Sequence, residues 1–262
     1  MSLYRAKPAD GAVWITGAST GIGRELAIAM ARAGWTVAAT ARSADKLVDL
    51  EEESKGWKGR IHAFPADVTD AARMVSTVDA IELNARKIVL AIFNAGSYWP
   101  ASGDRLDVKK FADTYALNVM GHVNGLAPVV EKFKSRGFGQ VMMVASVSGY
   151  SGLPTAAAYG ASKAAVINMA EALKFDFDAM NIRIQIVNPG FIETPLTDKN
   201  DFAMPALMPA AKAVARIIAG ISSGGFELTF PRRFTYVLKL MRILPYALYF
   251  PLMKKMTGAG KK

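Results

Sequence analysis

Short runs of hydrophobic residues alternate along the chain with longer stretches in which hydrophobic residues recur at helical spacing. The short runs predict strands at 12–16, 35–41, 60–68, 87–96, 139–146, 182–190 and 226–231. The longer stretches predict helices at 22–33, 43–55, 70–84, 107–135, 156–180 and 209–222. Strands of a parallel sheet are covered by helices on both faces and are almost continuously hydrophobic, as VLAIF and VMMV are here. The pattern therefore predicts an α/β fold with a doubly wound parallel sheet in a single domain.

Length and composition are consistent with one globular domain, since the chain has 262 residues, of which 52% are hydrophobic and 21% charged. We expect this domain to cover residues 1–231, followed by an apolar, basic and helical extension at 232–262. The chain has no Cys and only two His, His62 and His122. Disulfides and thiolate ligands are therefore excluded, and we expect no metal site and no Ser-His-Asp hydrolase. The lack of Cys, with no apolar run in the first ten residues, favours a cytoplasmic protein.

The formal net charge of +10 is compatible with nucleic acid, a membrane surface or an anionic small molecule as partner. Nucleic-acid binding would require basic residues gathered on one face, and only the two ends of the C-terminal segment show such gathering. We therefore expect a small-molecule partner and no nucleic acid.

A glycine-rich loop follows the first predicted strand and opens the first predicted helix. Its candidate contact residues are Gly17, Ser19, Thr20, Gly21, Ile22 and Gly23. Without Cβ atoms the backbone can turn tightly and approach a pyrophosphate, whose charge then meets N–H groups at the positive end of the helix dipole. An ordinary loop between strand and helix is the alternative, but this position in the chain favours dinucleotide binding.

The end of the second predicted strand indicates which dinucleotide binds. An NAD site usually offers a carboxylate to the ribose 2′-hydroxyl at this point, and this chain has none. Ala41 leaves room for a 2′-phosphate, Arg42 can pair with it, and Ser43 can donate from the start of the next helix. We therefore expect NADP (NADPH) rather than NAD, the alternative being that Arg42 is a solvated surface arginine.

Two further strand ends carry residues that predict contacts with the adenosine part of the cofactor. Asp67 and Val68 would lie near the adenine, and Asn94, Ala95 and Gly96 would lie beside the adenosine ribose. Each of these short segments could also be a helix cap or a turn.

Tyr159 and Lys163 are four residues apart on a predicted helix, so their side chains share one face. An ammonium group near a phenol lowers the phenol pKa, so that Tyr159 could exchange a proton with a carbonyl or alcohol oxygen near neutral pH. Such pairs occur by chance in many helices. However, Ser146 ends a predicted strand, where open parallel sheets place their ligands. Its hydroxyl could hold the substrate oxygen, with Ser148 as an alternative.

Together these motifs resemble the short-chain dehydrogenases/reductases over roughly residues 10–230. The matching segments are TGASTGIG, DV at 67–68, NAG at 94–96, Asn118 in LNVMG, Ser146, YGASK at 159–163 and NPGFIETP at 188–195. The resemblance implies a Rossmann-fold oxidoreductase that transfers a hydride between a nicotinamide and a carbonyl or alcohol. It implies that Tyr159 is the general acid/base, that Lys163 binds the nicotinamide ribose and lowers the Tyr159 pKa, and that Ser146 orients the carbonyl. Asn118 would interrupt a long helix and hold a water in a proton relay.

The resemblance also implies a loop that closes over the nicotinamide, with a homodimer or homotetramer built through the helices near 107–135 and 156–180. The candidate contacts in this loop are Pro189, Gly190, Ile192 and Thr194, of which the first two also suit a plain turn. Family members that use NADP often have a basic residue just before the second glycine. Because this chain has Thr20 there, Arg42 would recognise the phosphate almost alone. Phe93 and Ala145 also differ from the usual pattern, without touching the four catalytic candidates.

The segment after Pro231 carries more apolar surface than a solvated tail would, although charged residues and prolines within it argue against a membrane-spanning helix. It could cover the substrate cleft, pack between subunits, or lie on a membrane with its basic residues facing anionic head groups. We favour packing against the protein. All three arrangements suit a lipophilic ketone or aldehyde as substrate. An NADP-binding sensor or scaffold without turnover is the alternative function, and the complete catalytic set argues against it.

Overall fold

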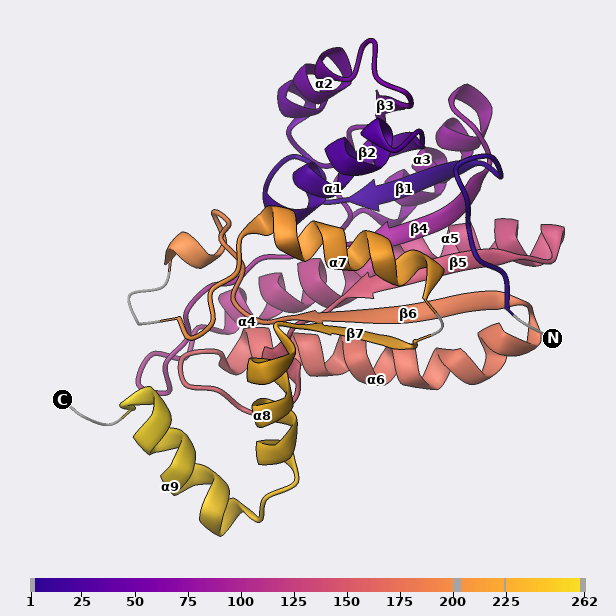
Figure 1. The fold of residues 1–262 in the computed structure, drawn as a ribbon. Helices are drawn as coiled ribbons and strands as arrows, with labels where there is room; N and C mark the ends of the chain where they lie inside the picture. Colours follow the sequence, from indigo (N-terminus) through magenta and orange to yellow (C-terminus); the bar gives the residue numbers. More distant parts are fainter. Residues whose placement is uncertain (1–2, 200–203, 224, 260–262) are drawn as a thin grey trace.

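A parallel sheet forms the middle layer of the molecule in the computed structural model, which describes residues 3–199, 204–223 and 225–259 (Figure 1). Its seven strands lie in the order β3-β2-β1-β4-β5-β6-β7, and every neighbouring pair is parallel. The strands are β1 (Ala12–Thr16), β2 (Thr36–Thr40), β3 (Arg60–Ala63), β4 (Ile88–Phe93), β5 (Gly139–Val144), β6 (Ile182–Pro189) and β7 (Glu227–Phe230). The predicted doubly wound α/β fold in a single domain is therefore confirmed.

Helices cover both faces of the sheet. They are α1 (Gly21–Arg32), α2 (Ala44–Glu53), α3 (Ala71–Asn84), α4 (Val108–Tyr115), α5 (Gly121–Arg136), α6 (Ala157–Ala179), α7 (Ala210–Ser222), α8 (Arg232–Arg242) and α9 (Tyr246–Thr257). One apolar core joins the sheet to α1, α2 and α7, and a second joins the opposite face to α3, α5 and α6. Strand order turns back at β1, which lies between β2 and β4. Ligands of open parallel sheets bind outside such a reversal point.

Most predicted elements agree with the structure to within a few residues, and the two larger differences have local causes. The strand expected at 60–68 ends at Ala63, where its pairing with β2 also ends. Pro65 follows, and its ring holds φ at about −65°, outside the range of a regular strand, although the N–H groups of Phe64 and Ala66 still donate to the carbonyl oxygens of Ala39 (2.9 Å) and Ala41 (3.1 Å). The single helix expected at 107–135 is divided by a π-helical turn, Ala116–Met120, which lies between α4 and α5. The turn contains Asn118, as the family resemblance implies.

The C-terminal helices α8 and α9 follow the end of β7 and project away from the sheet (Figure 1). Leu238, Met241, Tyr249 and Met253 are buried, but most of the large apolar side chains of these helices remain exposed. A single chain therefore buries only a smaller part of this apolar surface against its own domain, and what covers the rest stays a prediction. Among the described helices, none has the length and the apolar character that crossing a membrane requires.

Candidate active site

A crevice opens where β1, β2 and β4 end. It is lined by Gly17, Ser19, Thr20, Gly21, Ile22, Ala41, Arg42, Ser43, Ala66, Asp67, Val68, Asn94, Ala95, Gly96, Ser97, Leu117, Thr194, Pro195 and Leu196. Every predicted contact residue of the glycine-rich loop except Gly23 lies in this wall. All the contact residues predicted between residues 42 and 96 also lie in this wall, and so does Thr194 from the predicted closing loop. The fold thus brings together residues that are far apart in the sequence at the reversal point of the sheet.

The glycine-rich loop has its shape because two of its residues have no room for a side chain. Gly17 has a φ of +70°, and a Cβ placed on it would lie 2.8 Å from the Cα of Ala95. A Cβ on Gly23 would lie 2.2 Å from the carbonyl oxygen of Gly17. The side-chain amide of Asn94 also donates to the carbonyl oxygens of Thr16 (3.2 Å) and Gly17 (3.3 Å). Gly23 therefore packs behind the loop instead of lining the crevice, and Asn94 holds the loop in place.

The part of the crevice beyond β2 carries the residues expected at the adenosine end of the cofactor. Arg42 and Ser43 line the crevice and are exposed, so the guanidinium is available to an anionic ligand. Asp67 also lines the crevice, and its Oδ1 accepts hydrogen bonds from the backbone N–H (2.9 Å) and the hydroxyl (2.8 Å) of Thr69. The Asp67 carboxylate therefore fixes a local turn as well as facing the crevice.

Gly96 lines the crevice, and Asn118 and Lys163 lie directly behind it. A Cβ on Gly96 would be 3.2 Å from Asn118 Oδ1 and 3.3 Å from Lys163 Nζ. Asn118 Oδ1 accepts from the backbone N–H of Ser97 (2.9 Å), and its amide donates to the hydroxyl of Ser162 (3.0 Å). Lys163 Nζ donates to the carbonyl oxygen of Val144 (2.9 Å). The absence of a side chain at Gly96 thus leaves a buried ammonium group next to the crevice.

Tyr159 stands beside both Ser146 and Lys163. The ammonium of Lys163 lies 5.8 Å from the centre of the Tyr159 ring, and the ring of Tyr98 meets that of Tyr159 edge-on at 5.3 Å. Ser146 Oγ accepts from the backbone N–H of Ser148 (3.1 Å), so the strand end holds it in place. Ser146 is also the serine that hydrogen-bonds to the Tyr159 hydroxyl, whereas Ser148 contributes its backbone N–H to the turn.

Burial controls the proton affinities in this corner of the site. Desolvation raises the pKa of Tyr159 above its usual value, although hydrogen bonding to Ser146 opposes the shift. The same burial lowers the pKa of Lys163 to about 8 and that of His122, which lies near it, to about 3. In the chain by itself, burial sets the direction of the Tyr159 pKa shift, because a buried phenolate is poorly solvated. The lowering of this pKa by Lys163 stays a prediction.

The remaining predicted contacts, Pro189, Gly190 and Ile192, are not among the residues that line the crevice, and their contact with a cofactor stays a prediction. Pro189 ends β6 and is buried, while the N–H of Gly190 donates to the carbonyl oxygen of Phe230 (2.8 Å). Ile192 is also buried and pairs with Met208 in an isolated bridge. These three residues support the loop that carries Thr194 into the crevice wall.

Sequence reasoning missed several lining residues, which are Ala66, Ser97, Leu117, Pro195 and Leu196. Each is next to a predicted site residue in the sequence or one position further along. Adjacency was therefore the available signal, but nothing in their chemistry distinguishes them. Small and apolar side chains contribute shape to a binding site, and shape is a property of the folded chain.

Comparison with known proteins agrees with this geometry. The model of the short chain dehydrogenase family matches residues 11–204. An uncharacterized oxidoreductase of Myxococcus xanthus is 32% identical over 90% of this chain and 93% of its own length. The 3-oxoacyl-acyl-carrier-protein reductase of Thermotoga maritima is 33% identical over 71% of this chain and 75% of its own. A short-chain dehydrogenase structure from Streptomyces avermitilis has a TM-score of 0.77, with 26% identity over 87% of this chain and 90% of its own. The chain belongs to the short-chain dehydrogenase family and is an oxidoreductase of that family.

Proposed function

We propose that this protein is an NADPH-dependent reductase of a lipophilic ketone or aldehyde. The observation that carries the proposal is that Tyr159 lies beside both Ser146 and Lys163, and that Lys163 lies directly behind Gly96 of the glycine-lined crevice. A hydroxyl that can donate a proton, a second hydroxyl that can hold an oxygen, and a cation next to the crevice are the groups that carbonyl reduction needs.

The residues of the crevice fit a dinucleotide. The first turn of α1 contains no acidic residue, so its N–H groups and dipole are free to meet a pyrophosphate beside Gly17 and Gly21. Arg42 and Ser43 would hold a 2′-phosphate, since a guanidinium forms forked, charge-assisted bonds with phosphate oxygens. These two residues, with no carboxylate at the end of β2, support NADPH over NADH.

The reaction follows from the properties of the chain's own residues. When bound, NADPH supplies the hydride. Ser146 donates a hydrogen bond to the substrate carbonyl oxygen and orients it, and Tyr159 gives that oxygen a proton. Because burial keeps the Tyr159 pKa high, the phenol is protonated at neutral pH, which is the form that reduction requires. In the reverse direction the same hydroxyl receives the proton. Lys163 binds the nicotinamide ribose, and the π-helical turn at Asn118 holds a relay water.

A substrate with a long apolar part is supported by the chemistry around the site and by one relative. Phe191, in the loop that follows β6, packs against Phe234 of α8 with ring centres 5.7 Å apart, so apolar side chains extend from this loop to the C-terminal helices. The Thermotoga maritima relative is a reductase of 3-oxoacyl groups, which combine a ketone with an alkyl chain. We infer that this protein reduces a ketone or aldehyde of that general kind.

We also propose a homo-oligomer and a cytoplasmic location. The family resemblance places the contacts on α4, α5 and α6, and Val108, Tyr115 and Phe175 on α4 and α6 are large apolar side chains left exposed. A chain without Cys suits a reducing compartment.

The experiment that tests this function is a fluorescence titration with NADPH and NADH, followed by turnover assays on ketones and aldehydes of increasing chain length. We expect tighter binding of NADPH, and kcat/KM values that rise with chain length until the apolar surface is filled. Turnover that is indifferent to chain length would contradict the lipophilic substrate. Tight NADPH binding with no turnover of any carbonyl or alcohol would favour the sensor or scaffold instead.

A further inference from the structure

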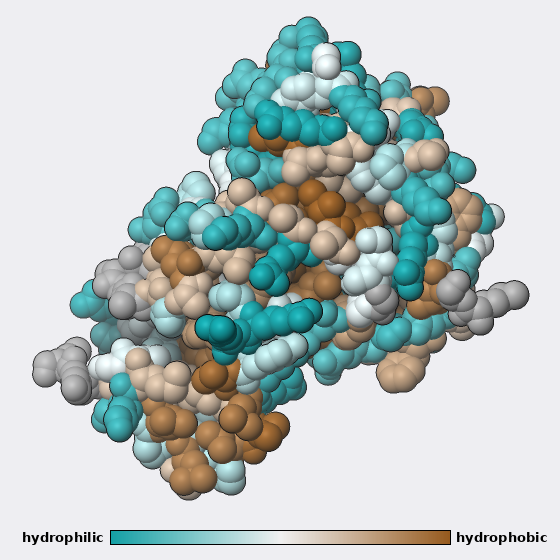
Figure 2. All heavy atoms as spheres, viewed as in Figure 1, coloured by the Kyte–Doolittle hydropathy of each residue, from teal (hydrophilic) through white to brown (hydrophobic). Residues whose placement is uncertain are grey.

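The helices α8 and α9 expose an apolar surface that the rest of the chain does not cover. We call it the C-terminal apolar face, and it consists of Tyr236, Val237, Leu240, Ile243, Tyr246, Leu248, Phe250, Leu252 and Met256. Figure 2 shows hydrophobic side chains gathered at the lower end of the molecule, where these helices lie in Figure 1. Ile243 and Tyr246 are 75% and 77% exposed, which is unusual for side chains of this size. A contiguous apolar patch of this kind marks an interaction site.

Helix α8 is apolar on two opposite sides. Leu238 and Met241, three residues apart, face the protein and are buried. Tyr236, Leu240 and Ile243 follow one another at intervals of four and three and form a stripe on the other side. A helix that only needs to dock on its own domain requires one apolar stripe. The second stripe therefore has another partner.

The charge of this segment identifies the chemistry of that partner. Residues 232–262 contain eight of the 32 basic residues of the chain and none of the 22 acidic ones. Residues 1–231 therefore carry 24 basic and 22 acidic side chains and are close to neutral. Arg232, Arg233, Arg242, Lys254 and Lys255 are all exposed. Among the described residues of this segment, only Lys239 forms an ion pair.

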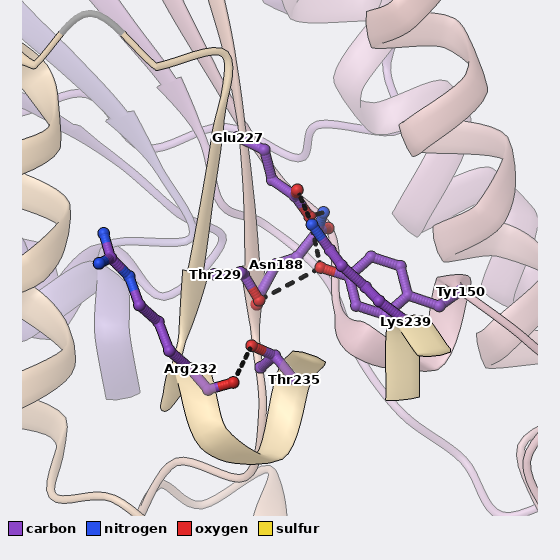
Figure 3. A network of polar contacts seen from close by, with 7 residues as sticks. All are labelled: Tyr150, Asn188, Glu227, Thr229, Arg232, Thr235 and Lys239. Carbon is purple, nitrogen blue, oxygen red and sulfur yellow. Dashed lines mark hydrogen bonds and ion pairs between the residues drawn. The ribbon is translucent and has the colours of Figure 1, made fainter. Parts of the chain in front are cut away.

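Polar contacts fix the position of the two helices. Lys239 of α8 pairs with Glu227 of β7, and the Tyr150 hydroxyl and the Asn188 amide (2.8 Å) donate to the same carboxylate (Figure 3). On α9, the Tyr249 hydroxyl donates to the carbonyl oxygen of Gly152. Lys239 also lies 5.5 Å from the centre of the Tyr150 ring, and Tyr150 and Gly152 both lie between Ser146 and α6, so α8 and α9 are held against that segment of the chain.

We propose that the C-terminal apolar face docks on the surface of an anionic lipid membrane. Exposed aromatic and aliphatic side chains would enter the head-group boundary, and the surrounding Arg and Lys side chains would face the lipid phosphates. The inference goes beyond the proposed reaction and does not depend on it.

A second copy of this chain fits the C-terminal apolar face less well. A two-fold interface places the same surface of each subunit against itself. Two basic segments would then face each other with no acidic side chain in either to compensate, and such like-charge contact is unfavourable. Lipid phosphates supply the missing negative charge.

The test is co-sedimentation of the whole protein with vesicles of phosphatidylcholine alone and of phosphatidylcholine mixed with phosphatidylglycerol. We expect binding to the mixed vesicles that weakens as salt is added, and much weaker binding to neutral vesicles. Two variants divide the contributions. The charge variant is R242Q/K254Q/K255Q, and the apolar variant is L240S/I243S/Y246S/F250S. Each should reduce partition onto the mixed vesicles by more than about tenfold.

Matched variants on the body of the protein provide the controls. K7Q/K58Q/K212Q removes the same charge from exposed positions elsewhere, and V48S/V75S/L83S/L106S removes the same number of exposed apolar side chains elsewhere. Both should bind the mixed vesicles as the unaltered protein does. NADPH affinity and melting temperature, measured for every variant, show that folding is intact.

Three results would overturn the proposal. One is a lack of binding to the mixed vesicles, and another is equal loss in the control variants. The third is that the unaltered protein self-associates with rising concentration in sedimentation velocity but does not bind vesicles, and that the apolar variant no longer self-associates. A second copy of the chain would then be the partner. Because these measurements involve no turnover, membrane docking can be disproved while the reductase activity is confirmed. In the same way, the reductase activity can be disproved while membrane docking is confirmed.

Discussion

The nucleotide crevice and the C-terminal apolar face differ in the size and exposure of the side chains that form them. In the crevice, small residues such as Gly17 and Gly96 remove side chains so that backbone and buried polar groups can approach a ligand. In α8 and α9, large side chains such as Ile243 and Tyr246 extend outward without a covering layer. The crevice lies within residues 11–204, which the family model matches, and the apolar face lies outside that range.

The difference indicates that the two regions bind different kinds of partner. The crevice recognises a ligand of fixed shape, so single atoms matter and a Cβ in the wrong place closes it. The apolar face needs only area and charge, because a fluid surface imposes no fixed geometry. We therefore expect single substitutions to act strongly in the crevice and weakly in the C-terminal helices.

The largest expected effect is at Tyr159. The Tyr159→Phe variant removes the proton donor while keeping the ring that packs on Tyr98, so kcat should fall by about 10²–10⁴-fold. The dissociation constant for NADPH should change little, because only one hydroxyl is lost. Steady-state kinetics and a fluorescence titration measure the two quantities. Tyr115→Phe, at an exposed tyrosine of α4, is the control. Retained turnover in Tyr159→Phe would remove this residue from the chemistry.

The next effect is on cofactor choice. The Arg42→Ala variant should raise the NADPH dissociation constant by about 10- to 100-fold, since a hydrogen bond to a charged group contributes about 1.5–3 kcal/mol. Its effect on NADH should be within about twofold, because NADH has no 2′-phosphate for the guanidinium to meet. Competitive titration with both cofactors gives the ratio, and Arg105→Ala, on an exposed loop outside the crevice wall, is the control. An equal loss for the two cofactors would disprove phosphate recognition by Arg42.

The smallest effect is on the attachment of α8. Burial by itself raises the pKa of Glu227, but hydrogen bonds from Lys239, Tyr150 and Asn188 outweigh it and bring the pKa below its usual 4.5. The Glu227→Gln variant should therefore lose about 1–2 kcal/mol of stability, a modest amount because the pair is partly exposed.

The pH dependence of this loss follows from the direction of the shift. A carboxylate with a lowered pKa stabilises the folded state above its unfolded-state pKa, and the contribution disappears as the pH falls through the folded-state value. The difference between the two proteins in urea unfolding should thus be full at neutral pH and decrease below about 4.5. Glu131→Gln, which removes an exposed pair with Lys134, should change stability very little. A pH-independent difference at Glu227 would mean that its charge does not hold α8.

The sequence by itself determined the strand and helix order, the position of the glycine-rich loop and the chemical candidates, because these depend on periodicity and local spacing. Apolar runs fixed β1 and β4, and the four-residue interval put Tyr159 and Lys163 on one face of α6. The tertiary structure decided what depends on distant neighbours. It added Leu117 and Leu196 to the crevice, placed Gly23 behind it, and raised the Tyr159 pKa through burial.

The C-terminal segment shows the same division most clearly. Its apolar and basic composition was evident from the sequence, and so was its need for a partner. The sequence did not show which of these side chains the protein itself buries. Helix α8 has two apolar stripes, and the spacing of residues does not say which one faces the core. Only the packing of Leu238 and Met241 against the domain, with Lys239 paired to Glu227, left the other stripe facing outward.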